Sequence, residues 1–194
     1  MNDLLHIASH FLIKGTPVSV KPLGDGLIND TYKVITAGED TPDYVLQRIN
    51  TDIFTDVDML QRNIISVTGH IRSKLREAGE TDLSRKTLTV VMADDGKAYR
   101  REDGSCWRMT VFIPRARTFD TVNTAHSYSA GTAFGRFEAM LADIGEMPGD
   151  IIPDFHNMEL RLRQLDDAVT NDAAGRASGV RDLLGELERR AFDM

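Results

Sequence analysis

The sequence predicts an α+β protein in which a small antiparallel β-sheet carrying one long helix precedes a helical part. Three observations lead to this prediction. Short alternating runs between turn residues fill most of the first 113 residues, residues 55–77 have a helical period, and only helical patterns follow Pro114. We therefore expect a sheet lobe over residues 1–113 and the beginning of a helical lobe over residues 114–194.

The candidate strands alternate apolar and polar residues and are bounded by turn residues. They are VSVKPL, DTYKVIT, YVLQRIN, KTLTVVM and SCWRMTVFI, with a short KAYR between the last two. The Asp-Gly pairs in ADDG and REDG are strong hairpin signals, and AGEDTPD separates the second strand from the third. This spacing predicts neighbouring strands that run antiparallel.

The candidate helices show apolar residues in steps of three and four. They cover residues 3–13, 55–77, 123–142, 158–170 and 176–192. The pattern is clearest in the second of these, where Val57, Leu60, Ile64 and Ile71 fall on one face. This long helix is expected to pack on the sheet.

The composition is that of an ordinary globular protein. Hydrophobic residues make up 41% and charged residues 27% of the chain. The length of 194 residues is enough for one large domain or two small lobes. The net charge of −7 argues against a nucleic-acid partner.

A single cysteine, Cys106, allows no internal disulfide and is expected to be a buried small hydrophobe. The sequence shows neither a signal peptide nor a membrane span, so we expect a cytoplasmic protein.

The stretch GDGLINDTYKV joins the first two predicted strands and can be read in two ways. It can be a hairpin turn with a solvated tip, or a loop whose backbone N–H groups approach phosphate oxygens at Gly24, Asp25 and Gly26. In the second case Asn29 and Thr31 could add side-chain donors. The stretch is neither a Walker A loop nor a full G-x-G-x-x-G motif. Both interpretations stay open at this point.

If the sheet holds a nucleotide, the third strand is the place for a cation that meets the phosphates. Gln47 and Arg48 are the candidates, and they point to opposite faces of the strand. Charge favours Arg48, although it could equally be a solvated arginine at an edge. The inner stretch of the long helix contains no acid, so Gln61 or Asn63 would have to hold that cation.

The strand WRMTVFI would lead into a hinge between the two lobes. Backbone groups of Phe112 and Ile113 would then pair with an adenine edge. The alternation of Trp107, Met109 and Val111 also fits a strand that simply faces the core, and the two interpretations are compatible.

Two histidine features complete the candidates. His6 and His10 are four residues apart, a spacing at which two histidines can share a metal, but without an H-E-x-x-H motif we expect a solvated helix face. His156 follows an aromatic residue in PDFH, and Asn157 is expected to cap the helix that follows it.

An ordered set of motifs resembles the N-acetylhexosamine 1-kinase branch of the aminoglycoside phosphotransferase (choline kinase-like) superfamily. The motifs are GLINDTYKV, YVLQRIN, IFTDVDMLQRNIISVTGHI, WRMTVFI, AFGRFEAMLAD and IPDFHN…R…DAAGR. The resemblance implies a protein-kinase-like fold. It also implies ATP-dependent phosphorylation of a sugar hydroxyl with magnesium, typically the anomeric hydroxyl of GlcNAc or GalNAc, so the implied partners are a nucleotide and an amino sugar.

The family's catalytic motifs do not occur in this sequence. The family has a His-x-Asp followed by Asn, which supplies the base and a metal ligand, and a later Asp-x-Asp that holds magnesium. The stretch after His156 reads HNMELRL and has no aspartate at the required place. The chain looks like the N-terminal part of such a kinase, cut before its catalytic centre. We therefore expect no catalytic residue, no metal ligand and no meaningful turnover.

Further expectations follow from this interpretation. ATP and magnesium should bind weakly or not at all, and uncovered helices in residues 123–192 should promote self-association. Two alternatives remain. The chain could be a kinase-like interaction module without catalysis, or a relative that acts on choline, homoserine or an aminoglycoside.

Overall fold

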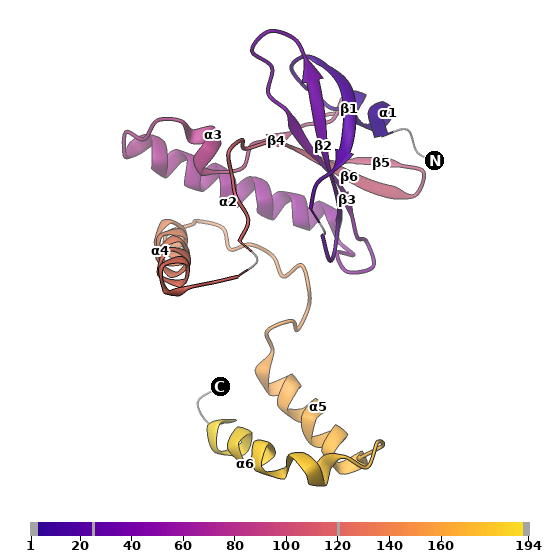
Figure 1. The fold of residues 1–194 in the computed structure, drawn as a ribbon, viewed down its shortest axis with the longest axis vertical. Helices are drawn as coiled ribbons and strands as arrows, with labels where there is room; N and C mark the ends of the chain where they lie inside the picture. The colour runs from indigo at the N-terminus through magenta and orange to yellow at the C-terminus, as the bar shows by residue number, and fades with distance from the viewer. Residues whose placement is uncertain (1–3, 25, 120, 192–194) are drawn as a thin grey trace. The chain divides into compact units, whose positions relative to one another are not determined.

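A computed structural model describes residues 4–24, 26–119 and 121–191 (Figure 1). The chain divides into two compact units, Met1–Ile151 and Ile152–Met194. The first unit contains the whole sheet and the long helix. The predicted boundary between a nucleotide-binding lobe and a helical lobe, at residue 113, stays a prediction.

The sheet is antiparallel throughout, with the strand order β1-β2-β3-β6-β4, and β5 pairs with β6. The strands are β1 (Thr16–Pro22), β2 (Asp30–Ala37), β3 (Tyr44–Ile49), β4 (Val90–Val91), β5 (Arg100–Glu102) and β6 (Ser105–Val111). The predicted hairpin at REDG is confirmed, because Glu102 pairs with Ser105 across Asp103 and Gly104. Both turn residues have positive φ angles, 47° and 74°, as a type I′ turn requires.

Apart from the short helix α3 (Leu83–Lys86), which the sequence did not predict, the helices lie close to their predicted positions. They are α1 (Leu4–Ser9), α2 (Val57–Glu77), α3 (Leu83–Lys86), α4 (Thr124–Leu141), α5 (Met158–Asn171) and α6 (Arg181–Arg190), with a 3-10 turn at Ala177–Val180. Asp56 caps α2 by accepting a hydrogen bond from the Met59 N–H at 2.8 Å. Asn157 caps α5 in the same way through the Leu160 N–H, as predicted.

The N-terminal helix is shorter than the predicted span of residues 3–13. Phe11 forms an antiparallel bridge with Ala93, and the Leu12 N–H donates to the Met92 carbonyl at 2.8 Å. These residues therefore pair with the sheet, and tertiary contact overrides the helical pattern.

Two apolar cores lie on the two faces of the sheet. One joins α1 to strand residues, and the other joins α2 to residues of β3 and β6. The first comprises Ile7, Ala8, Phe11, Val34, Tyr44, Leu46, Val91, Ala93, Trp107 and Met109. The second comprises Ile49, Val57, Leu60, Tyr99 and Cys106. The predicted burial of Cys106 is confirmed.

The alternation of β3 follows from these cores. Leu46 faces α1, whereas Ile49 faces α2. Because side chains of a strand alternate, Gln47 shares the α2 face with Ile49, and Arg48 shares the α1 face with Leu46.

Polar contacts join α2 to the last turn of α4 and to the residues that follow it. His70 contacts the Asp143 carboxylate at 3.1 Å, and Lys74 forms an ion pair with the same group. Hydrogen bonds from Lys74 and His70 lower the pKa of Asp143, so this carboxylate is ionised at neutral pH. The first unit therefore extends beyond the sheet and its long helix to include α4.

Exposed aromatic side chains mark the first helix after the sheet. Tyr128 and Phe134 of α4 are 78% and 69% exposed. Exposed apolar surface of this kind favours association, and the expected self-association stays a prediction. Among the described residues, no helix is long and apolar enough to cross a bilayer.

Candidate functional site

The glycine-containing loop lies between β1 and β2. The Leu23 N–H donates to the Thr31 carbonyl at 2.9 Å and closes its base. Gly24 has a φ of +71°, which favours glycine, and a Cβ on Gly26 would lie 2.5 Å from the Asn29 carbonyl oxygen. Both glycines are therefore needed for the shape of this turn. Asp25, the third predicted loop residue, lies outside the described residues.

The two side chains predicted as phosphate donors hold the loop in place. Asn29 Oδ1 accepts a hydrogen bond from the Asn50 N–H at 2.9 Å, and Thr31 Oγ1 accepts one from Gln47 Nε2 at 2.9 Å. Each of these contacts ties the loop to β3 or to the residue after it. An anion at this loop would therefore meet mainly backbone N–H groups.

A row of three polar side chains crosses the sheet next to the loop. Thr31 on β2 lies opposite Gln47 on β3, and Gln47 lies opposite Arg108 on β6. Gln47 donates to Thr31 and accepts a hydrogen bond from Arg108 Nε at 3.0 Å. The strand neighbours of these residues, such as Leu46 and Met109, belong to the core beneath α1. Because side chains of a strand alternate, the row itself lies on the face covered by α2.

Arg108 is the charged member of this row. It is partly buried, and among the described residues no carboxylate lies within ion-pair distance of its guanidinium group. Burial lowers the pKa of Arg108, yet an arginine keeps its charge at neutral pH. Its Nε bonds a neutral amide, so the other guanidinium N–H groups can bind an anion in the forked geometry that phosphate prefers.

Sequence reasoning missed Arg108 because it treated the whole strand as a core element leading to a hinge. A signal was present, since Arg108 is the single charged residue in SCWRMTV. Its importance depends on the register that places it beside Gln47, and that register is a tertiary property.

Arg48, favoured from charge, lies on the opposite face of the sheet. Its Nε donates to Asp30 Oδ2 at 2.7 Å. Both residues line a polar hollow of about 350 Å³ that also contains Asp52. A phosphate there would compete with Asp30 for the guanidinium group and would be repelled by both carboxylates. The prediction that one of these two residues, Gln47 or Arg48, contacts a nucleotide stays a prediction.

The two amides of α2 proposed as partners of a cation have different surroundings. Asn63 uses its side chain on the Gly149 backbone, with Nδ2 donating at 2.7 Å and Oδ1 accepting at 3.0 Å. Gln61 is 3% exposed, and neither of its amide atoms has a hydrogen-bond partner among the described residues. An unpaired buried amide costs about 1–3 kcal/mol, so Gln61 is a polar group that remains available for water or a ligand.

Replacing Gln61 with methionine is expected to raise the free energy of unfolding by about 1 kcal/mol, because an unpaired amide is removed from an apolar site at similar volume. Urea unfolding followed by circular dichroism measures the change. Asn63→Met is the matched control, and it should destabilise because it removes two hydrogen bonds to Gly149. Destabilisation by Gln61→Met would show that the amide makes a stabilising contact.

The predicted hinge residues lie just beyond β6. The Phe112 N–H donates to the Asp43 carbonyl at 2.9 Å, and Lys33 Nζ lies 4.2 Å from the centre of the Phe112 ring. The Phe112 N–H is therefore already satisfied, which leaves the Ile113 N–H as the donor for the predicted adenine contact. Ile113 also lines an apolar groove of about 480 Å³ together with Leu60 and Phe137.

The fold is of the α+β class, with an antiparallel sheet, one long helix that covers it and further helices after it. It is similar to the fold of kinase-like phosphotransferases. The predicted fold class is thus confirmed. The solved structure of spectinomycin phosphotransferase APH(9)-Ia, in complex with ADP and spectinomycin, matches 98% of this chain with a TM-score of 0.54. The two sequences are 9% identical over the match.

The chain spans 57% of the length of that phosphotransferase. The likeness agrees, at the level of fold, with the resemblance to the aminoglycoside phosphotransferase superfamily. No protein-family model matches the sequence.

Proposed function

We propose that this chain provides the nucleotide-binding part of an ATP-dependent phosphotransferase. The observation that carries the proposal is Arg108, a partly buried cation without an acidic partner among the described residues, held by Gln47 in a row that ends beside the glycine loop. The fold of a phosphotransferase solved with ADP supports it.

The chemistry of phosphoryl transfer explains the need for such a row. The reaction depends on positioning the phosphates and on stabilising their charge. The Arg108 guanidinium would supply a forked pair of donors, and the loop at Gly24 and Gly26 would supply backbone N–H groups. The base and the magnesium ligands of the family do not occur in this sequence, so the transfer step requires a chain that also carries them.

The proposed acceptor is the anomeric hydroxyl of an N-acetylhexosamine. This choice rests on the resemblance of INDTY and LQRIN to the hexosamine branch. An aminoglycoside is the competing acceptor, since the similar solved structure is a spectinomycin phosphotransferase. Phosphorylation of GlcNAc, GalNAc and spectinomycin by a longer chain that carries the catalytic motifs, followed by phosphorus NMR, distinguishes them.

A second candidate function is a kinase-like interaction module that binds no nucleotide. The exposed aromatic side chains of Tyr128 and Phe134 on α4 favour it, because such a surface can pack against a protein partner. Calorimetric titration of Mg·ATP into this chain, and into the longer chain, separates the two functions. Binding by either supports the nucleotide proposal, and binding by neither overturns it.

In the longer chain, replacing Gly24 with alanine is expected to weaken Mg·ATP binding by about tenfold. Alanine disfavours the left-handed backbone by about 1–2 kcal/mol, so the free loop would relax and binding would have to restore its shape. Gly79→Ala is a closely matched control. Its φ is +72° against +71° at Gly24, and neither added Cβ would meet an atom within 4 Å. Calorimetry on both variants checks the prediction. Equal affinities would show that the loop is only a hairpin tip.

A further inference from the structure

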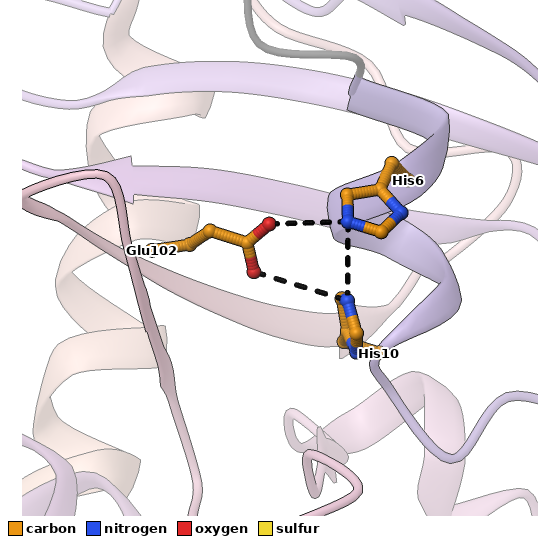
Figure 2. Close-up of side chains that lie close together, drawn as sticks. All are labelled: His6, His10 and Glu102. Carbon is orange, nitrogen blue, oxygen red and sulfur yellow. Dashed lines mark hydrogen bonds and ion pairs between the residues drawn. The ribbon is translucent and has the colours of Figure 1, made fainter.

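Two histidines of the N-terminal segment and one glutamate of the sheet come together at the surface of the first unit (Figure 2). His6 lies in α1, and His10 directly follows the end of that helix. Their spacing of four residues places both rings on one side of the segment. Glu102, the last residue of β5, faces them from the β5–β6 hairpin.

The three side chains approach one another at distances that suit a common ligand. His6 Nε2 lies 3.3 Å from Glu102 Oε1 and 3.4 Å from His10 Nε2, and His10 Nε2 lies 3.9 Å from Glu102 Oε2. Tetrahedral zinc with bonds of about 2.0–2.1 Å places its ligand atoms about 3.3–3.4 Å apart. The distances from His6 Nε2 to Glu102 Oε1 and to His10 Nε2 already match that spacing. With one ligand atom from each residue, all three atoms lie within 4.8 Å of one another, so a small rotation of Glu102 would complete the set.

A second layer of contacts orients these ligands. His10 Nδ1 lies 2.7 Å from Asp94 Oδ2, so the ring donates Nδ1–H to that carboxylate and directs the Nε2 lone pair toward His6. Arg100 bonds Asp94 at 3.0 Å and Glu102 at 3.2 Å, which restrains both carboxylates. Metal-binding histidines commonly have this carboxylate partner on the other ring nitrogen.

The charge of the cluster also suits a divalent cation. The two carboxylates of Asp94 and Glu102 outweigh the single guanidinium of Arg100. The formal charges of these three side chains therefore sum to a negative value, which favours a bound cation.

We propose that His6, His10 and Glu102 bind one Zn²⁺ ion. Two imidazoles and one carboxylate are a ligand set that zinc prefers, and three protein ligands leave a fourth position for water. That position is open to solvent, because the His6 side chain is 60% exposed. The ion would connect the N-terminal helix to the β5–β6 hairpin. This proposal is independent of the proposed nucleotide site, which contains none of these residues.

Calorimetric titration of ZnCl₂ into the full chain, free of any affinity tag and stripped with a chelator, tests the proposal. We expect one Zn²⁺ per chain with micromolar or tighter affinity. His6→Ala and Glu102→Gln should each weaken binding by at least about tenfold, and Asp94→Asn by about ten- to a hundredfold through loss of its orienting contact with His10. His156→Ala, which removes a histidine of the second unit, should bind as the wild type does.

Cobalt provides a second measurement that does not depend on any variant. Co²⁺ bound to the wild-type chain should show the visible absorption of a tetrahedral site, and Zn²⁺ should displace it. The proposal is wrong if zinc does not saturate the chain at micromolar concentrations, if His6→Ala binds as tightly as wild type, or if cobalt gives only an octahedral spectrum. If zinc does not saturate the chain, the histidines and Glu102 form a hydrogen-bonded contact without a metal ion.

Discussion

In the longer chain that carries the catalytic motifs, replacing Arg108 with methionine is expected to weaken Mg·ATP binding by at least about tenfold, since a hydrogen bond to a charged group contributes about 1.5–3 kcal/mol. The free energy of unfolding should change by no more than about 1 kcal/mol, because no buried carboxylate loses its partner in the described structure. Inside the protein, the substitution removes the hydrogen bond from Arg108 Nε to Gln47. The substitution should therefore change the affinity for Mg·ATP much more than the free energy of unfolding.

Calorimetry with Mg·ATP measures the first effect, and urea unfolding measures the second. Arg48→Met is the matched control, because Arg48 lies on the adjacent strand but on the opposite face, where it pairs with Asp30. We expect it to retain nucleotide affinity. If Arg48→Met weakens binding and Arg108→Met does not, the phosphate site lies on the α1 face, as charge alone suggested.

Replacing Leu46 with alanine is expected to lower the free energy of unfolding by about 3 kcal/mol, within the usual range of about 2–5 kcal/mol for a buried leucine. Leu46 is 0% exposed and lies in the core between α1 and the sheet. Its strand is central, with β2 on one side and β6 on the other. The cavity left behind would have little room to collapse.

Tryptophan fluorescence during urea unfolding reports this change selectively. Trp107 is the single tryptophan of the chain and lies in the same core as Leu46, so its signal follows the first unit. Leu12→Ala in the first unit is the control, because the Leu12 side chain is 67% exposed and its loss should cost less than about 0.5 kcal/mol. A loss below about 1 kcal/mol for Leu46→Ala would mean that this core is loosely packed.

The order of elements could be predicted from the sequence because its signals are local. The apolar steps in residues 55–77, the Asp-Gly pair before Ser105 and the capping Asn157 each act within a few residues, and all three reappear in the structure. The end of α1 could not be predicted in this way. The pairing of Phe11 with Ala93, more than eighty residues away, replaces the last helical turn.

The composition of the candidate site depended on the register of three strands. The sequence by itself determined that Gln47 and Arg48 point to opposite faces, since strand side chains alternate. Only the tertiary structure decided that Gln47 lies on the α2 face and that Arg108 lies beside it. The zinc proposal has the same origin, because Glu102 is far from His6 in sequence and meets it through sheet pairing. Local periodicity thus determines which elements form, whereas long-range packing decides which side chains meet.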